Sequence, residues 1–173
     1  MRTPRPPQPR HPHGLIFSTD TAARLTMQRH VRGMNCMPTV CVDTNIWIYA
    51  LSVPNTGDAS KHQIAQSSIQ TAGKITLTPQ IINELGFALR RKHTWTDDDL
   101  RPMFTHLLGS CTLHIPSSDW HLNALELRSI FSLSYWDSLI VAAALEAGCH
   151  TLISEDMQHQ QQIDGLRIIN PFK

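Results

Sequence analysis

Four acidic residues sit where predicted strands end or predicted helices begin, and they are the side chains best suited to do chemistry. They are Asp43, Glu84, Asp137 and Asp156. Asp43 comes directly after the apolar run Thr39–Val42, and Asp137 opens an alanine-rich stretch. Carboxylate oxygens are hard ligands that suit Mg²⁺ or Mn²⁺, and such ions support the hydrolysis of phosphodiester bonds. Gathered at one place, the four acids would predict a metal-dependent hydrolytic site.

The elements that must position these acids alternate between strands and helices. Strands are predicted at residues 39–42, 74–77, 111–115, 149–153 and 166–169. Helices are predicted to about residue 50, over 58–72, from Pro79 to about residue 92, from Thr96 to about residue 109, from Ser117 or Ser118 to about residue 131, and from Ser134 to Gly148. Strands separated by helices indicate a single α/β domain with a central parallel sheet and helices on both faces. Because ligands bind beyond the carboxyl ends of such strands, we expect the four acids to converge there.

Each acid alone has an ordinary structural explanation. Asp43 can cap a helix, Asp137 can complement a helix dipole behind Ser134, Asp156 can belong to a turn, and Glu84 can face solvent. Together, four carboxylates at one edge would repel each other and raise each other's pKa unless a cation compensates them. The neighbouring side chains Thr44, Asn45 and Ser154 are suited to orienting carboxylates or bound water. The set as a whole therefore favours a metal site.

Charge is distributed unevenly along the chain, although its net value is only +1. Residues 1–37 contain six arginines and one acid, a charge of +5, and five of the eleven prolines fall in the first twelve residues. Such a segment buries too little apolar surface to offset its ordering entropy, so we expect a disordered basic extension. It is suited to nonspecific RNA binding, but we favour no function, since Met37 would make a natural start. The domain is expected over residues 38–173.

Composition excludes several classes of protein. The longest apolar run, Leu139–Leu145, has seven residues, against about 20 needed to span a bilayer. The N-terminal run Leu15–Phe17 is too short for the core of a signal peptide. The four cysteines form no C-x-x-C pair, and Cys41, Cys111 and Cys149, in or beside predicted strands, are expected to be buried, reduced thiols. We therefore expect a cytoplasmic protein without membrane segments.

Two charged runs outside the four acids have contrasting interpretations. Asp97–Asp99 follow the expected cap Thr96, where acids favour the helix dipole, so a structural role is expected. Arg90, Arg91 and Lys92 end a predicted helix, where cations are favoured, but they would also suit contact with RNA phosphates or an acidic partner. The sequence leaves these two readings of the basic run open.

Four motifs in this order resemble those of PIN-domain ribonucleases, and most closely the VapC-type toxins of type II toxin–antitoxin pairs. The motifs are Val42–Asn45, Asn83–Glu84, Tyr135–Ile140 and Ser154–Asp156, and the resemblance extends over about residues 38–172. It implies a PIN-like fold in which Asp43, Glu84, Asp137 and Asp156 form the catalytic, metal-binding set. In that family the fourth acid follows Ser or Thr by two positions, which points to Asp156 rather than Glu155.

The resemblance further implies a Mg²⁺- or Mn²⁺-dependent endoribonuclease that is a homodimer and is held by a cognate antitoxin protein. The preference for RNA over DNA rests on the resemblance, because hydrolysis to a 5′-phosphate and a 3′-hydroxyl does not use the 2′-hydroxyl. Two alternatives stay open. One is a noncatalytic RNA- or partner-binding module of the same fold. The other is an aspartyl-nucleophile phosphatase, which would need an acid two residues after Asp43, where this chain has Asn45.

Overall fold

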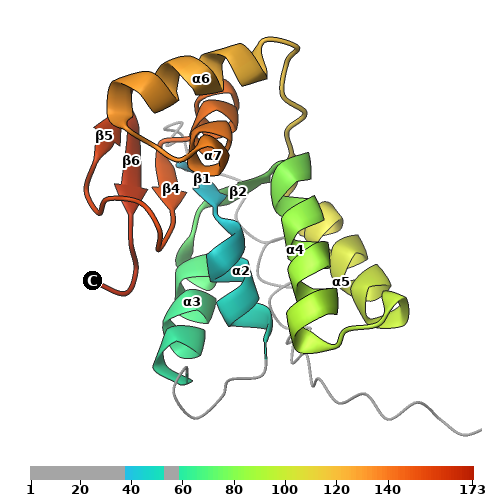
Figure 1. Cartoon of the computed structure of the whole chain (residues 1–173). Coiled ribbons are helices and arrows are strands. Elements are labelled where there is room, and N and C mark those ends of the chain that lie inside the picture. Colours follow the sequence, from blue (N-terminus) through green and yellow to red (C-terminus); the bar gives the residue numbers. More distant parts are fainter. Residues whose placement is uncertain (1–37, 53–58) are drawn as a thin grey trace, which may run out of the picture. The chain divides into compact units, whose positions relative to one another are not determined.

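The computed structural model describes residues 38–52 and 59–173, and the basic segment expected at 1–37 lies outside these residues. The described chain contains one six-stranded sheet and the helices that cover it (Figure 1). The strands are β1 (Thr39–Val42), β2 (Lys74–Leu77), β3 (Thr112–Leu113), β4 (Thr151–Ile153), β5 (Gln162–Ile163) and β6 (Leu166–Ile169). The helices are α2 (Thr44–Leu51), α3 (Ala59–Thr71), α4 (Pro79–His93), α5 (Asp97–Ser110), α6 (Trp120–Phe131) and α7 (Tyr135–Glu146).

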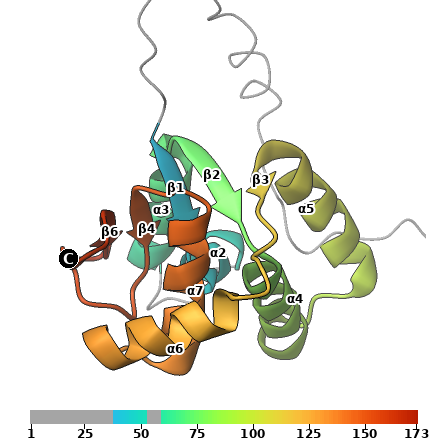
Figure 2. The ribbon, with the colours of Figure 1, turned by 90° about the horizontal axis from the view of Figure 1, so that it is seen from above.

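The sheet has the order β3-β2-β1-β4-β6-β5, and all neighbours are parallel except β5 and β6. β1 lies in the middle, with Val40 opposite Ile75 of β2 on one side and Thr151 of β4 on the other; Figure 2 shows this arrangement from above. Val40, Cys41 and Val42 are all buried. Because successive side chains of a strand point to opposite faces, helices must cover both faces of the sheet. The expected α/β fold is therefore confirmed.

Helix starts at the carboxyl end of the sheet follow from local capping. Thr78 caps α4 through a bond of 3.3 Å from the Ile81 N–H to its hydroxyl, with Pro79 at the first position. Ser134 caps α7 in the same way through the Asp137 N–H, at 3.1 Å. α5 begins with a capping box between Thr96 and Asp99, as expected for that acidic run. The caps at Thr78 and Ser134 fix where α4 and α7 begin, and therefore where Glu84 and Asp137 lie on these helices.

Four details of the secondary structure differ from the sequence expectations. β3 has two residues and β4 has three, where five were expected in each, and α6 begins at Trp120, beyond both expected serines. β5 was not expected, and it pairs antiparallel with β6 through a two-residue turn at Asp164 and Gly165, with φ of 47° and 89°. Two successive left-handed residues are the geometry of a hairpin turn, which Asp-Gly favours. The differences affect element ends and the sheet edges, and the central strands are present as expected.

The core joins the sheet to its helices through apolar side chains. α7 contributes a continuous buried run from Ser138 to Ala144, and β1 and β4 contribute Cys41 and Leu152, both fully buried. Cys41 and Cys149 are buried and Cys111 is half-buried, and all three are free thiols, as expected; Cys36 lies outside the described residues. No helix of the described chain combines the length and apolar character needed to cross a bilayer.

Candidate active site

Asp43 lies at the carboxyl end of the central strand, where β1 gives way to α2. Its backbone N–H donates to the Ile153 carbonyl at 2.9 Å, which fixes the residue against the end of β4. Its side chain is 4% exposed and accepts hydrogen bonds from the Thr44 N–H at 2.6 Å and from the Ser154 hydroxyl at 2.6 Å. Asp43 is therefore both the cap of α2 and a buried acid.

Burial raises the pKa of Asp43 from 3.8 to about 6. The hydrogen bonds from Ser154 and Thr44 lower this pKa, because they stabilise the charged form, while the charges of Asp156 and Glu84 raise it. The negative charges of Asp156 and Glu84 therefore lie close enough to Asp43 to raise its pKa. The expected convergence holds for these three carboxylates.

Glu84 is held by one hydrogen bond to each of its carboxylate oxygens. The Thr44 hydroxyl donates to Oε2 at 2.8 Å, and the Gln80 side-chain amide donates to Oε1 at 2.8 Å. The Gln80 amide also approaches the Trp136 carbonyl at 3.4 Å, which links α4 to the first turn of α7. Thr44 therefore joins α2 to α4, and Gln80 joins α4 to α7.

Asp156 accepts a hydrogen bond from Asn45, the second residue of α2. The Asn45 amide donates to Asp156 Oδ2 at 2.9 Å and to Asp43 Oδ2 at 3.4 Å, so it bridges the two acids. The Ser154 hydroxyl also accepts the Asp156 N–H at 3.3 Å. All three neutral side chains proposed from the sequence, Thr44, Asn45 and Ser154, therefore contact carboxylates of the set.

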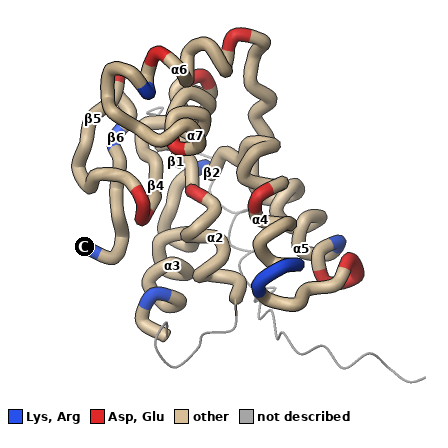
Figure 3. Tube along the Cα trace, in the orientation of Figure 1, with Lys and Arg blue, Asp and Glu red and all other residues tan. Residues whose placement is uncertain are grey.

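Asp137 is on α7 at the same edge, but it is engaged differently. Its Oδ2 accepts a hydrogen bond from the Ser134 hydroxyl at 2.7 Å, so its carboxylate belongs to the helix cap. In the described chain no hydrogen bond joins it to the other three acids, and its only tie to them runs through Gln80 and the adjacent Trp136. Figure 3 shows the acidic segments after β1 and β4, in α4 and at the start of α7 on one side of the ribbon.

The donor atoms present suit a hard divalent cation. Across residues 38–52 and 59–173, no three His, Cys, Asp or Glu side chains are arranged to hold a metal ion among themselves. However, two buried amide oxygens beside the acids, Asn45 Oδ1 and Gln80 Oε1, have no hydrogen-bond donor. Together with Asp43, Glu84 and Asp156 they make an all-oxygen environment with uncompensated negative charge, which is the chemistry that Mg²⁺ and Mn²⁺ prefer.

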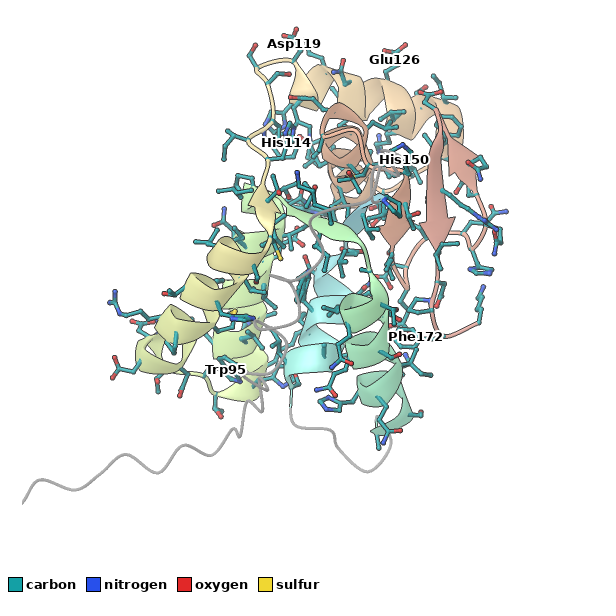
Figure 4. All side chains as sticks on the ribbon, turned by 180° about the vertical axis from the view of Figure 1, so that it is seen from behind. Trp95, His114, Asp119, Glu126, His150 and Phe172 are labelled. Carbon is teal, nitrogen blue, oxygen red and sulfur yellow. The ribbon has the colours of Figure 1, made fainter. Side chains whose placement is uncertain are left out.

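The loop that carries Asp156 is anchored by residues outside the acid pocket, the site formed by Asp43, Glu84 and Asp156. Lys61 of α3 forms an ion pair with Glu155 and donates to the Tyr49 hydroxyl at 3.1 Å. The Asn170 amide donates to the Glu155 carbonyl at 3.0 Å, and Phe172, labelled in Figure 4, packs edge-on against Tyr49 at 5.4 Å. The C-terminal segment and α3 therefore hold the loop in place.

The last turn of α4 carries the basic residues and lies farther from the sheet than the start of the helix does (Figure 3). Arg90 is paired with Asp97 at 2.5 Å, and both side chains are more than half exposed. The Arg91 guanidinium lies 5.6 Å from the centre of the Phe87 ring, and Lys92 is exposed. Arg90 therefore has a structural partner, while contact of Arg91 and Lys92 with RNA phosphates or an acidic partner stays a prediction.

Gln80 is the residue of this site that sequence reasoning missed. It is 7% exposed and occupies the second position of α4, one helical turn before Glu84. The available signal was the i, i+4 spacing, since residues four apart on a helix face each other. A glutamine there was unremarkable without a reason to suspect that the first turn of α4 is buried.

Comparison with known proteins agrees with this geometry. The family described as PIN domain matches residues 40–166, and the chain belongs to that family. No curated protein matches the sequence. The similarity to solved structures is therefore one of fold, at low sequence identity.

Three solved structures illustrate the likeness. A toxin–antitoxin complex from Klebsiella pneumoniae has a TM-score of 0.58 and 18% identity, covering 78% of this chain and 98% of the other. VapBC2 of Rickettsia felis, bound to a DNA fragment from its promoter, has a TM-score of 0.52 and 17% identity, covering 75% and 96%. VapC20 of Mycobacterium tuberculosis, a toxin that cleaves the sarcin–ricin loop, has a TM-score of 0.51 and 18% identity, covering 65% and 86%. The chain thus resembles VapC toxins in fold.

Proposed function

We propose that this PIN-domain protein is a metal-dependent endoribonuclease and the toxin of a toxin–antitoxin pair. The observation that carries the proposal is the buried Asp43 carboxylate, whose pKa is raised to about 6 by burial and by the nearby Asp156 and Glu84. Carboxylates held close together without a compensating cation destabilise the fold. Acids with such perturbed pKa values are concentrated at functional sites. The fold likeness to VapC toxins supports RNA as the substrate.

In the proposed mechanism Asp43, Glu84 and Asp156 would hold the ion, with Asp137 as the fourth acid. When bound, Mg²⁺ or Mn²⁺ would supply Lewis-acid chemistry that activates water and neutralises charge on the reacting phosphate. The chain's own contribution is orientation: Thr44 and Gln80 fix the two oxygens of Glu84, and Asn45 fixes Asp156 relative to Asp43. Hydrolysis would leave a 5′-phosphate and a 3′-hydroxyl.

Two partners are part of the proposal. Structures of this fold have been solved as toxin–antitoxin complexes, which supports a cognate antitoxin for this chain. An antitoxin segment with a basic residue would compensate the acid pocket, and a homodimer is proposed on the same likeness. The phosphatase alternative is disfavoured, because Asn45 holds the position of the required acid and its amide already donates to Asp156.

The test is cleavage of total cellular RNA by purified protein in Mg²⁺, Mn²⁺ or EDTA, beside Asp43→Asn. We expect discrete metal-dependent fragments with 5′-phosphates, lost in the variant. Glu126→Gln is the matched control, since Glu126 is exposed on the outer side of α6 (Figure 4). Full activity of Asp43→Asn would refute the assignment of the site. Absence of both cleavage and metal binding would favour the noncatalytic module.

A further inference from the structure

One face of α4 leads from the acid pocket to the surface. Gln80, Glu84, Phe87 and Arg91 recur at the spacing of a single helical stripe. Gln80 is buried and bonds Glu84, whereas Phe87, one turn farther, is 64% exposed. The Arg91 guanidinium lies over that ring at 5.6 Å. Along about 10 Å of the helix axis, this stripe presents first the Glu84 carboxylate, then the exposed Phe87 ring, and then the Arg91 guanidinium.

A second exposed aromatic residue lies on the other side of Gln80. Trp136 of α7 is 62% exposed, directly precedes Asp137, and receives the Gln80 amide on its carbonyl at 3.4 Å. Its ring lies 6.0 Å from that of Tyr135, which is 38% exposed. In the described chain, the exposed large aromatics are Phe87, Tyr135 and Trp136. All three are within three residues of a predicted catalytic acid.

We propose that Phe87 and Trp136 stack on unpaired bases of the RNA substrate, and that Arg91 contacts its backbone phosphate. The inference rests on the proposed nuclease function and adds to it the side chains that would hold unpaired bases beside the acids. Bases in a duplex are already stacked on their neighbours, so exposed rings gain little from them, whereas unpaired bases offer a free face. The acids repel a polyanion, and the cation beside Phe87 offsets that repulsion where the strand approaches.

The proposal favours RNA over a protein segment as the occupant because of the pairing of ring and cation. A guanidinium next to an aromatic ring offers a phosphate contact and a stacking face within one nucleotide's reach. An acidic antitoxin segment would use Arg91 but would gain nothing specific from aromatic character. Replacing the rings by leucine, which preserves apolar bulk, therefore separates the two occupants.

The experiment measures binding of a short single-stranded oligoribonucleotide of mixed sequence, and of the same strand annealed to its complement. Proteins carry Asp43→Asn to prevent cleavage, alone or with Phe87→Leu, Trp136→Leu or Arg91→Gln. We expect each aromatic change to weaken single-strand binding about fivefold or more, with little effect on the duplex. Arg91→Gln should reduce the salt dependence of binding to both RNAs. Leu122→Ala, an equally exposed apolar residue on α6, is the control.

Tryptophan fluorescence gives an independent readout. Of the chain's four tryptophans, Trp47 and Trp95 are buried and Trp120 is half-buried, which leaves Trp136 as the ring open to solvent. Single-stranded RNA should quench emission in the parent protein, and Trp136→Leu should remove most of that quenching. The control Leu122→Ala should leave it unchanged.

The outcomes separate this inference from the nuclease function. If total RNA is cleaved but the leucine variants bind single strands as tightly as the parent, stacking is refuted while the nuclease stands. If the leucine variants bound the single strand and the duplex with equally weakened affinity, base stacking would also be refuted, because the rings would then contact the RNA backbone rather than unpaired bases. If nothing is cleaved and no metal binds, the proposed function itself fails.

Discussion

Asp43→Asn is expected to stabilise the metal-free protein at neutral pH, although it abolishes the proposed activity. The side chain is 4% exposed, and its pKa is raised from 3.8 to about 6, chiefly by burial. A shift of this size corresponds to about 3 kcal/mol of unfavourable free energy for keeping the carboxylate charged in the fold. Asparagine has no charge, so this cost disappears.

The hydrogen bonds that Asp43 accepts reduce the stabilisation expected from the asparagine substitution. An asparagine oxygen can still accept the Thr44 N–H, and its amide can donate to the Ser154 hydroxyl in place of the present bond. The Asn45 amide, 3.4 Å away, would then face another donor. Allowing about 1 kcal/mol for this mismatch, the net stabilisation above pH 7 is about 2 kcal/mol, or roughly 4–8 °C in Tm.

The pH dependence has a definite sign. A carboxyl group whose pKa is higher in the folded than in the unfolded chain binds more protons when folded. The contribution of Asp43 to stability is therefore fully present below about pH 4 and is lost as pH rises through about 6. Asparagine does not titrate, so the variant should gain on the parent across this window and equal it within about 1 kcal/mol at pH 4.

Urea denaturation in EDTA at pH 4, 5, 6 and 7.5 measures this difference, with Glu126→Gln as a control that should show no such trend. Adding Mn²⁺ at pH 7.5 should then stabilise the parent and not Asp43→Asn, because only the parent binds the ion in its native state. A variant no more stable than the parent at pH 7.5, with a difference independent of pH, would refute the reasoning that burial raises the pKa of Asp43.

Three further changes test the surroundings of the site. Gln80→Ala should lower the cleavage rate roughly tenfold with a smaller effect on KM, because the oxygens of Glu84 lose an orienting donor; single-turnover kinetics would show it. Lys61→Met should cost less than about 1 kcal/mol in urea denaturation, yet lower cleavage by loosening the Asp156 loop; equal activity would contradict the anchoring role. Gly73→Ala should destabilise by about 1–3 kcal/mol, because its Cβ would lie 2.5 Å from the Pro38 carbonyl oxygen, whereas Gly109→Ala, with open space around it, should be neutral or stabilising by calorimetry.

The centre of the fold could be predicted because its signals are local and strong. Thr78-Pro79 and Ser134 mark helix starts, and the apolar runs of β1 and β4 mark buried strands. The β5 hairpin was missed although Asp164-Gly165 is a turn signal, because two-residue strands are too short to show a period. The start of α6 was missed because Asp119 makes no capping bond with its side chain.

At the site, the sequence predicted the acidic residues that come together better than it predicted the hydrogen bonds that hold them. Asp43, Glu84 and Asp156 converge because two follow adjacent parallel strands and the third lies early in a helix after another. Asp137 could not be placed as closely, since its carboxylate bonds Ser134 within its own helix cap. For Gln80 the sequence offered only the i, i+4 spacing to Glu84, and Lys61 could not be found because its role depends on contacts between segments far apart in the sequence.

Within residues 38–52 and 59–173, no basic side chain compensates the negative charge around Asp43. Asp43 is surrounded by neutral donors from Thr44 and Ser154, which stabilise a carboxylate without cancelling it. In the described chain no cation lowers the pKa of Asp43, and Lys61, the basic residue anchored beside the Asp156 loop, is paired with Glu155. Burying the Asp43 carboxylate beside the negative charges of Glu84 and Asp156 is costly unless an opposite charge arrives. A divalent ion during catalysis, and a basic antitoxin side chain during inhibition, would meet the same electrostatic need, so the two should compete for the pocket.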